Sequence, residues 1–265
     1  MKRLAFALAL LAAPAMAQPE TVNVDGTQTL TGLWRISFPG GASGYMPGRG
    51  RLYTAGMDAF CRLQQRGGRV AAHCLPGWGP DSGSGELDGE DLHLAWGITL
   101  MRAVIDAKVA NGSARAFTGA FALKVFGIRH DSPEPASARK LTPDPAAPDR
   151  PGKARLVRQA LAELAAGAIA MPHEADVTLN FGHQLGSNQA NTPEEIRGLG
   201  TVETVLYLGE ASAAHGRVAG AGTLPANLVI PGFGFSAYQV EFANGERLCG
   251  IHQRDDGVMD GFLCV

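Results

Sequence analysis

FSAYQVEFANGERLCGIHQRDDGVMDGFLCV, residues 235–265, is the stretch that decides the fold of this chain. Two turn signals, Asn244-Gly245 and Asp256-Gly257, divide it into three strands, because such dipeptides accept the positive φ angles of a tight hairpin turn. With each dipeptide at the centre of its turn, the expected cross-strand pairs are Phe242–Arg247, Val240–Cys249, Tyr238–Ile251, Ile251–Phe262 and Cys249–Cys264.

This register sorts the side chains of the three strands onto two faces, since successive residues of a strand point to opposite sides. The face predicted to be buried carries Tyr238, Val240, Phe242, Cys249, Ile251, Phe262 and Cys264. The opposite face carries Glu241, His252 and Asp260 and is expected to be solvated.

A second glycine turn, Gly67-Gly68, gives the same arrangement of cysteines. Centring it predicts the pairs Gln65–Val70, Leu63–Ala72 and Cys61–Cys74. Residues opposite each other in antiparallel strands lie within disulfide reach. The chain has four cysteines, an even number, and they favour two disulfides over a metal site. We therefore predict the bridges Cys61–Cys74 and Cys249–Cys264.

Residues 1–17 are predicted to be a secretory signal peptide. Lys2-Arg3 form a charged start, an apolar run follows, and Ala15-Met16-Ala17 supplies small residues for cleavage. The apolar run is shorter than the about 20 residues that a membrane span needs. We expect a mature chain that begins near Gln18, in the periplasm or secreted, without membrane insertion.

Residues 22–130 are predicted to form a β-rich domain. Trp34, Ile36 and Phe38 alternate with Arg35 and Ser37, which is the pattern of a half-buried strand. No helical pattern interrupts the short strands and regular turns, which indicates an antiparallel meander that closes into a barrel or sandwich. Further strands are expected at 58–65, 69–75, 92–98, 103–109 and 117–125, and loops rich in glycine at 39–50 and 78–85.

The opening of this domain, Leu30-Thr-Gly32-Leu-Trp34-Arg-Ile36, resembles the Gly-x-Trp opening of lipocalin-type barrels. The resemblance implies that Trp34 closes the bottom of the barrel and does not touch ligand. The strand signals also resemble those of small secreted barrels that inhibit metalloproteases, so both families stay open.

Residues 131–153 are interpreted as an extended, semi-rigid linker between two domains. They hold six of the sixteen prolines and few large apolar residues.

Residues 154–265 are predicted to be an α+β domain with a four-stranded antiparallel sheet. Apolar residues at three-and-four spacing predict a helix over 154–166 that Gly167 ends, and Thr192-Pro193 opens a second, short helix. A strand is expected near 202–208, before the closing meander. A further short strand is expected at 177–181, and an irregular insertion at 210–231.

The sheet half of this domain resembles the nuclear-transport-factor-2-like (NTF2-like) domains of exported bacterial proteins. The resemblance rests on Leu199-Gly200-x-Val202-x-x-Val205-x-Tyr207-Leu208-Gly209 and on the two turn dipeptides after it. It covers roughly the last seventy residues and implies a fold more than an activity.

Charge and motif content exclude several classes of function. The formal net charge of −2 gives no basic surface for nucleic acid. The seven histidines show no zinc-type spacing, so no metal and no cofactor is expected. We interpret as polar loops or turns the His173-Glu174 region with Asp176 and His183, the serines Ser82 and Ser84, and Arg254-Asp255-Asp256.

Trp96 and Arg102 are the candidate ligand-binding residues. Both lie in the middle of the N-terminal meander, where Trp96 shares a face with Leu92 and Leu94 that would point into a barrel. The alternative is that Trp96 is ordinary core and Arg102 only ends a strand.

Three classes of function follow. We favour an exported, non-catalytic binding or scaffold protein that could hold a small apolar or amphipathic ligand in the N-terminal barrel. The alternatives are an NTF2-like isomerase or hydrolase, which needs an ionisable group in an apolar pocket, and a secreted protease inhibitor. No catalytic residue is predicted, because the buried face of the closing sheet holds no acid or base apart from Tyr238.

Overall fold

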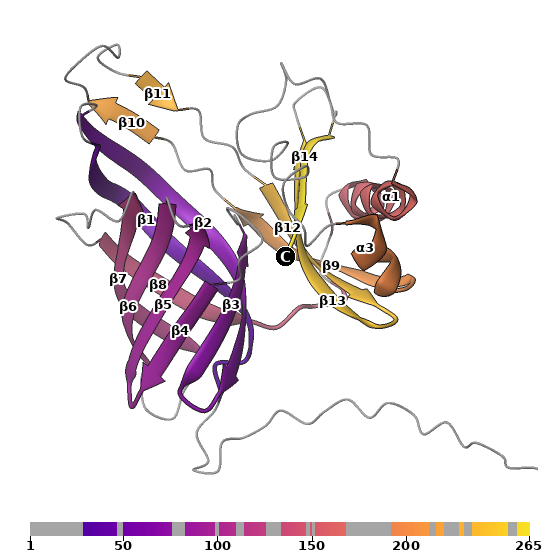
Figure 1. The fold of residues 1–265 in the computed structure, drawn as a ribbon, viewed down its shortest axis with the longest axis horizontal. Helices are drawn as coiled ribbons and strands as arrows, with labels where there is room; N and C mark the ends of the chain where they lie inside the picture. The colour runs from indigo at the N-terminus through magenta and orange to yellow at the C-terminus, as the bar shows by residue number, and fades with distance from the viewer. Residues whose placement is uncertain are drawn as a thin grey trace, which may run out of the picture.

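In a computed structural model of the chain, the residues described are 29–46, 50–75, 83–98, 101–109, 114–125, 134–146, 149, 152–167, 192–211, 216–219, 228–230, 235–253 and 259–265. The strands are antiparallel throughout, and they form a barrel and a separate four-stranded sheet (Figure 1). Among the described residues, no helix has the length and apolar character that crossing a membrane would require.

The barrel is closed because β1 pairs with β8 on one side and with β2 on the other. Every other barrel strand pairs with its neighbours in sequence, which confirms the expected meander. The strands are β1 (Gly32–Met46), β2 (Gly50–Arg66), β3 (Arg69–Leu75), β4 (Gly83–Asp88), β5 (Asp91–Ile98), β6 (Met101–Val109), β7 (Ala116–Val125) and β8 (Glu134–Leu141).

The interior of the barrel is filled by the inward side chains of these strands. Trp34 is fully buried, its Nε1 donates to the carbonyl oxygen of Leu30 at 2.7 Å, and its ring lies 5.1 Å from that of Phe117. Leu63, Leu94 and other core residues are likewise 0 % exposed. The strands were predicted from an alternation of apolar and polar residues, and its apolar members are the side chains that the barrel buries.

The β2–β3 hairpin has the predicted register, with Cys61 opposite Cys74, and the predicted disulfide joins them. Glycine is also required where barrel strands approach closely. A Cβ at Gly85 would lie 2.2 Å from the carbonyl oxygen of His93, and one at Gly119 would lie 2.3 Å from that of Asp106. A side chain at either position would force adjacent strands apart.

Two stretches expected to lack regular structure contribute strands to the barrel. Residues 39–50 were expected to be a loop, but β1 runs on to Met46 and β2 begins at Gly50, because the two strands continue to pair with each other. Within the proline-rich stretch 131–153, β8 pairs with both β7 and β1. Pro135 is accommodated at the start of that strand, where a missing N–H costs least.

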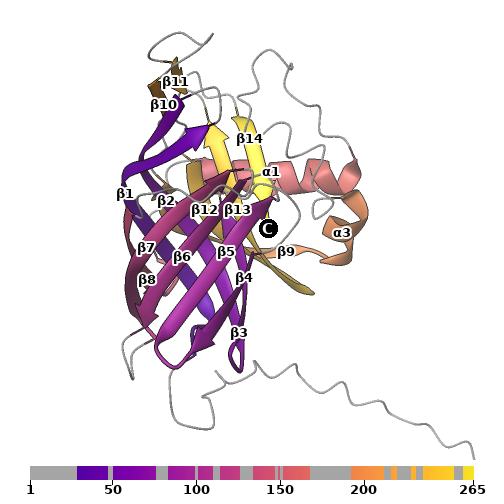
Figure 2. The same cartoon turned by 60° about the vertical axis from the view of Figure 1, so that its left-hand side comes forward.

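The second sheet has the order β14-β13-β12-β9, and two helices accompany it. The sheet lies between the barrel and the helices (Figure 1), and α1 crosses its strands (Figure 2). The elements are α1 (Lys153–Ala166), α3 (Pro193–Gly198), β9 (Val202–Ala211), β12 (Phe235–Phe242), β13 (Gly245–Gln253) and β14 (Met259–Cys264).

Both helix boundaries follow the sequence signals. Gly167 caps α1 in the left-handed conformation with φ of 69°, as its position predicted. Thr192 caps α3 in a capping box with Glu195, and Pro193 occupies the first turn.

The first hairpin of the closing meander differs from its predicted register by two residues. Tyr238 pairs with Cys249 and Phe242 with Gly245, so the turn lies at Ala243-Asn244. The backbone N–H of Asn244 donates to the carbonyl oxygen of Leu199 at 2.9 Å, and this contact fixes the position of the turn. A shift of two residues leaves every side chain on its predicted face.

The second hairpin has the predicted pairs Cys249–Cys264 and Ile251–Phe262, and the predicted disulfide joins the cysteines. All seven residues of the predicted buried face are at most 5 % exposed, and they pack against α1 and α3.

The opposite face of this sheet is covered at its centre, which corrects the expectation that it is solvated. Leu33, Phe60 and Leu75 on the outside of the barrel pack against sheet residues, among them Ala237 and Leu248, which are 0 % exposed. We call this apolar cluster the shared core. Because the barrel surface itself is the cover, strand alternation in the sheet alone could not reveal it.

Strands from the expected irregular insertion also join the barrel. β10 (Gly216–Ala219) pairs with β2, and β11 (Leu228–Ile230) pairs with β10. Residues 210–211 complete β9. The predicted strand at 177–181 lies outside the described residues.

Candidate functional site

Trp96, the first predicted ligand-binding residue, lies inside the barrel and is 3 % exposed. Its ring stacks on that of Phe38 at 6.3 Å, and Phe38 lies 4.0 Å from Phe121. We call these three rings the aromatic layer. β8 pairs with β7 only up to Phe121 and with β1 only up to Ser37, so the aromatic layer lies at the level where β8 begins.

Arg102, the second predicted ligand-binding residue, is not near Trp96. Trp96 pairs with Ala103, which is buried, and Arg102, the residue that precedes Ala103 in β6, is exposed. Strand alternation therefore places its side chain on the outer surface of the barrel. The structure does not bring the two residues together.

A shallow depression of about 390 Å³ lies on the outer face of β4 to β7. Its polar side chains form cross-strand pairs: His93 Nδ1 contacts Asp106 Oδ1 at 2.5 Å, and Lys108 Nζ contacts Asp91 Oδ1 at 2.5 Å. All four side chains are more than half exposed. Solvated pairs of this kind contribute little to stability.

A buried polar network joins α1 to the C-terminal sheet. Tyr238 is 0 % exposed and donates its hydroxyl to Asp149 Oδ1 at 2.6 Å. The other oxygen of Asp149 accepts from the backbone N–H of Ala154 at 2.9 Å, in the first turn of α1. Asp149 therefore ties the positive end of the helix to the sheet. Burial first, and then this hydrogen bond, raise the pKa of Tyr238 far above its usual value.

A second part of the network converges on Glu210. Its Oε1 accepts from Ser236 Oγ at 2.8 Å and from Tyr207 at 2.9 Å, and Lys153 Nζ lies at 3.5 Å. Lys153 also donates to Ser236 Oγ at 2.6 Å. Ser236 is 0 % exposed, so its hydroxyl is not available to a substrate. Each of these side chains has a partner in the network, which is the condition under which buried polar groups stabilise a fold.

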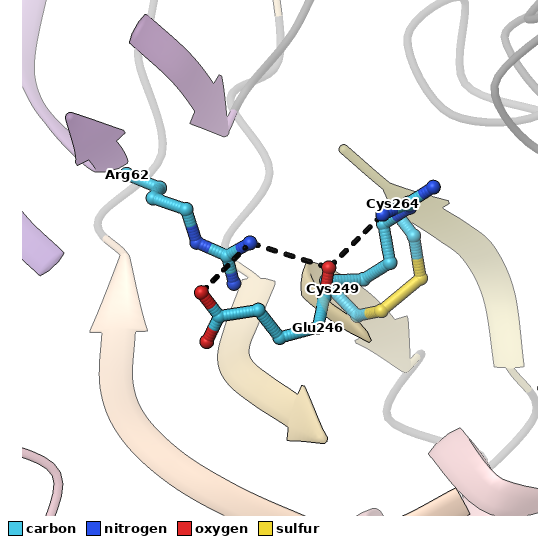
Figure 3. Close-up of a disulfide and its surroundings, with 5 residues drawn as sticks. Arg62, Glu246, Cys249 and Cys264 are labelled. Atoms are coloured by element: carbon cyan, nitrogen blue, oxygen red, sulfur yellow. Dashed lines mark hydrogen bonds and ion pairs between the residues drawn. A yellow bond between two sulfur atoms is a disulfide. The ribbon is translucent and has the colours of Figure 1, made fainter. Parts of the chain in front are cut away.

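A third polar group lies where the barrel meets β13. Arg62 Nη1 donates to the carbonyl oxygen of Glu246 at 3.2 Å and lies 3.3 Å from its carboxylate (Figure 3). Arg247 Nη1 donates to the same carbonyl oxygen at 3.0 Å. His73 is the cross-strand partner of Arg62. We call Arg62, His73 and Arg247 the cationic junction.

The charges of the cationic junction act on one another. Burial lowers the pKa of Arg62, the nearby Glu246 opposes this change, and Arg247 adds to it. Burial also lowers the pKa of His73, followed by the charges of Arg62 and Arg247. Both guanidinium charges therefore favour the uncharged form of His73.

Sequence reasoning missed these polar groups for different reasons. The Gly67-Gly68 register already placed Arg62 opposite His73, so the pairing of two of the three junction residues could be predicted from the sequence. Its contact with Glu246 joins residues 184 positions apart and has no local signal. The same holds for Asp149 and Tyr238, which are 89 positions apart.

Within the described ranges, no three histidine, cysteine or carboxylate side chains converge in an arrangement that could hold a metal ion. Ser84 is an exposed residue of β4. Several other residues weighed for chemistry lie outside the described residues: Ser82, His173, Glu174, Asp176, His183 and Arg254 to Asp256.

Comparisons with known proteins complete the description of the site. No protein-family model matches the chain, and neither the curated proteins nor the solved structures contain a match to it.

Proposed function

We propose that this chain is an exported, non-catalytic binding or scaffold protein, and that its barrel holds a small apolar or amphipathic ligand on the aromatic layer. The observation that carries the proposal is the position of Phe38, Trp96 and Phe121 across a closed barrel. On the side of these rings that holds Trp34, which we call the lower side, the interior is filled by side chains. On the other, upper side, β1 and β2 remain paired from Phe38–Met57 to Met46–Gly50.

The ligand would therefore lie on the aromatic layer, against the wall that β1 and β2 form above it (Figure 1). Flat aromatic rings offer an apolar surface of this kind to a ligand, and β-barrels commonly bind ligands at their mouths. Arg102 has no direct part in this proposal, because it lies on the outer surface of the barrel. Trp96 retains the role that the sequence suggested.

The absence of catalysis is part of the same proposal. The buried and partly buried ionisable groups at the C-terminal sheet are engaged with each other: Tyr238 with Asp149, and Glu210 with Lys153. A general base must be able to reach a substrate proton. Groups that hold a helix on a sheet support a scaffolding role.

Energy transfer from tryptophan to an amphipathic naphthalene sulfonate probe tests the ligand site. We expect probe binding to quench the fluorescence of the Trp34→Phe variant as strongly as that of the wild type, and to quench the Trp96→Phe variant much less. Trp34 is the matched control, because it lies in the same barrel and hydrogen bonds to Leu30. Equal quenching in the two variants, with intact melting transitions, would refute a site on the aromatic layer.

A second candidate is an NTF2-like enzyme, which two neighbouring hydrogen bonds favour, that of Tyr238 to Asp149 and that of Tyr207 to Glu210. Such an enzyme would use a carboxylate under the helix as its base, with Tyr238 polarising the substrate. Asp149→Asn would then abolish turnover of an isomerase or esterase test substrate, whereas the binding proposal expects no turnover in either protein.

Export and the finer family resemblances belong to this proposal. The two disulfides fit an oxidising, non-cytoplasmic location. We propose periplasmic or extracellular localisation after cleavage before Gln18, a lipocalin-like barrel and an NTF2-like second domain. Mass spectrometry of the exported protein tests the cleavage, and a product that still contains Met1 would contradict it.

A further inference from the structure

One buried donor atom in the cationic junction lacks a partner. Nη2 of Arg62 is buried, and no acceptor in the described part of the chain lies within hydrogen-bonding distance of it. Arg62 as a whole is 9 % exposed, so solvent does not substitute for the missing acceptor. A buried donor without an acceptor destabilises the fold, and more so when it is charged.

The charges around this atom are also unbalanced. Two guanidinium groups, those of Arg62 and Arg247, lie beside a single carboxylate, that of Glu246. Glu246 also accepts from Gln239 Nε2 at 2.8 Å, so its negative charge is shared with a further donor. Glu241, which pairs with Glu246 across the strands, is hydrogen-bonded to Thr204. The described groups thus leave the junction with excess positive charge.

Both disulfides of the protein hold the strands that carry these cations. Cys61 and Cys74 immediately precede and follow the pair Arg62–His73 in their strands, and Cys249 lies two residues after Arg247. The bridge beside Glu246 is visible in Figure 3. Covalent support on both sides of a group of cations keeps their spacing fixed, as a preorganised binding site requires.

From these observations we propose that the cationic junction is a binding site for a small oxyanion, a carboxylate or a phosphate, which binds Nη2 of Arg62. The planar guanidinium group binds such oxyanions through two parallel hydrogen bonds. Arg247 supplies the remaining positive charge from β13, and His73, on β3 opposite Arg62, adds charge only when it is protonated.

The carboxylate of Glu246 competes with the incoming anion for Arg62. Its side chain is 44 % exposed, whereas that of Arg62 is 11 % exposed, so Glu246 forms the solvent side of the pair. The anion enters as the Glu246 side chain moves towards solvent, and it then binds the guanidinium in place of that carboxylate. This inference is independent of the proposed ligand on the aromatic layer, because the two places lie on opposite faces of the barrel wall.

Anion binding should change the protonation of His73. The charges of Arg62 and Arg247 lower the pKa of His73, and a bound anion offsets them. The pKa of His73 should therefore rise when the anion binds, and the anion should bind more tightly at lower pH. The charged groups that act on His73 are Arg62 and Arg247, and Glu246 on β13 contacts Arg62.

Proton NMR of the full chain tests the proposal through the ring resonance of His73, assigned with His73→Gln. Sodium phosphate and sodium succinate are titrated separately at constant ionic strength. We expect at least one of them to raise the pH midpoint of His73. Arg247→Met should weaken binding by about tenfold, as expected for one charged hydrogen bond. Glu246→Gln should tighten it by about threefold, because the competing carboxylate is lost.

Controls separate a site from a general charge effect. Arg155→Met removes an exposed charge from α1 and should leave binding as in the wild type. Arg247→Lys keeps the charge without the planar fork, and it serves if Arg247→Met fails to fold. A response to phosphate alone or to succinate alone supports the proposal and identifies the anion. An unchanged His73 midpoint with both anions, weaker binding in Glu246→Gln, or equal losses in Arg155→Met and Arg247→Met would overturn it.

Discussion

Leu75→Ala should destabilise the barrel and the C-terminal sheet together. The side chain of Leu75 is 0 % exposed and packs in the shared core, and a Cβ on Gly250 would lie 3.4 Å from its Cδ1. Truncating a fully buried leucine leaves a cavity and costs about 2–5 kcal/mol. For a chain of this length that loss lowers the melting temperature by roughly 4–20 °C.

Two optical signals distinguish the two halves in this experiment. Every tryptophan of the chain precedes residue 97, so tryptophan fluorescence follows the barrel, and the far-ultraviolet helical signal follows α1. In Leu75→Ala both transitions should move down and begin to separate. In the control Leu63→Ala, which truncates a leucine inside the barrel, they should move down together. If Leu75→Ala lowers the fluorescence transition and leaves the helical one at its wild-type temperature, the shared core does not couple the two halves.

Three further predictions concern the bridges, the polar network and the chain between the halves. Replacing Cys61 and Cys74 by serine should cost about 3 kcal/mol, measured by urea unfolding, because the bridge closes a short loop. The raised pKa of Tyr238 means that the folded state keeps this proton where the unfolded state loses it. Its contribution to stability is thus complete below about pH 10 and declines above it, and Tyr238→Phe, which also loses the bond to Asp149, should show a smaller alkaline decline. Proteolysis within residues 142–152 should give two pieces that elute together on gel filtration, because the shared core holds them; separate elution would contradict this.

Local sequence chemistry determined most strands of the barrel, the β2–β3 hairpin and both bridges of this protein. The alternation of Trp34, Ile36 and Phe38 predicted a strand because the barrel buries every second side chain. The turn at Gly67-Gly68 predicted the pairing of Cys61 with Cys74, since a tight turn fixes the register of its two strands. These features depend on residues that are close together in the sequence, so they can be predicted without knowledge of the fold.

Only the tertiary structure decided the contacts between these elements. The first turn of the closing meander moved by two residues because Asn244 bonds to Leu199, a contact that no turn rule contains. Phe60 and Leu75 face outward from the barrel and are buried only because the C-terminal sheet covers them. Arg62 meets Glu246 across 184 residues, and its buried, partnerless nitrogen exists only once both halves are packed. Such contacts depend on surfaces that folding itself creates, and the order of residues along the chain does not encode them locally.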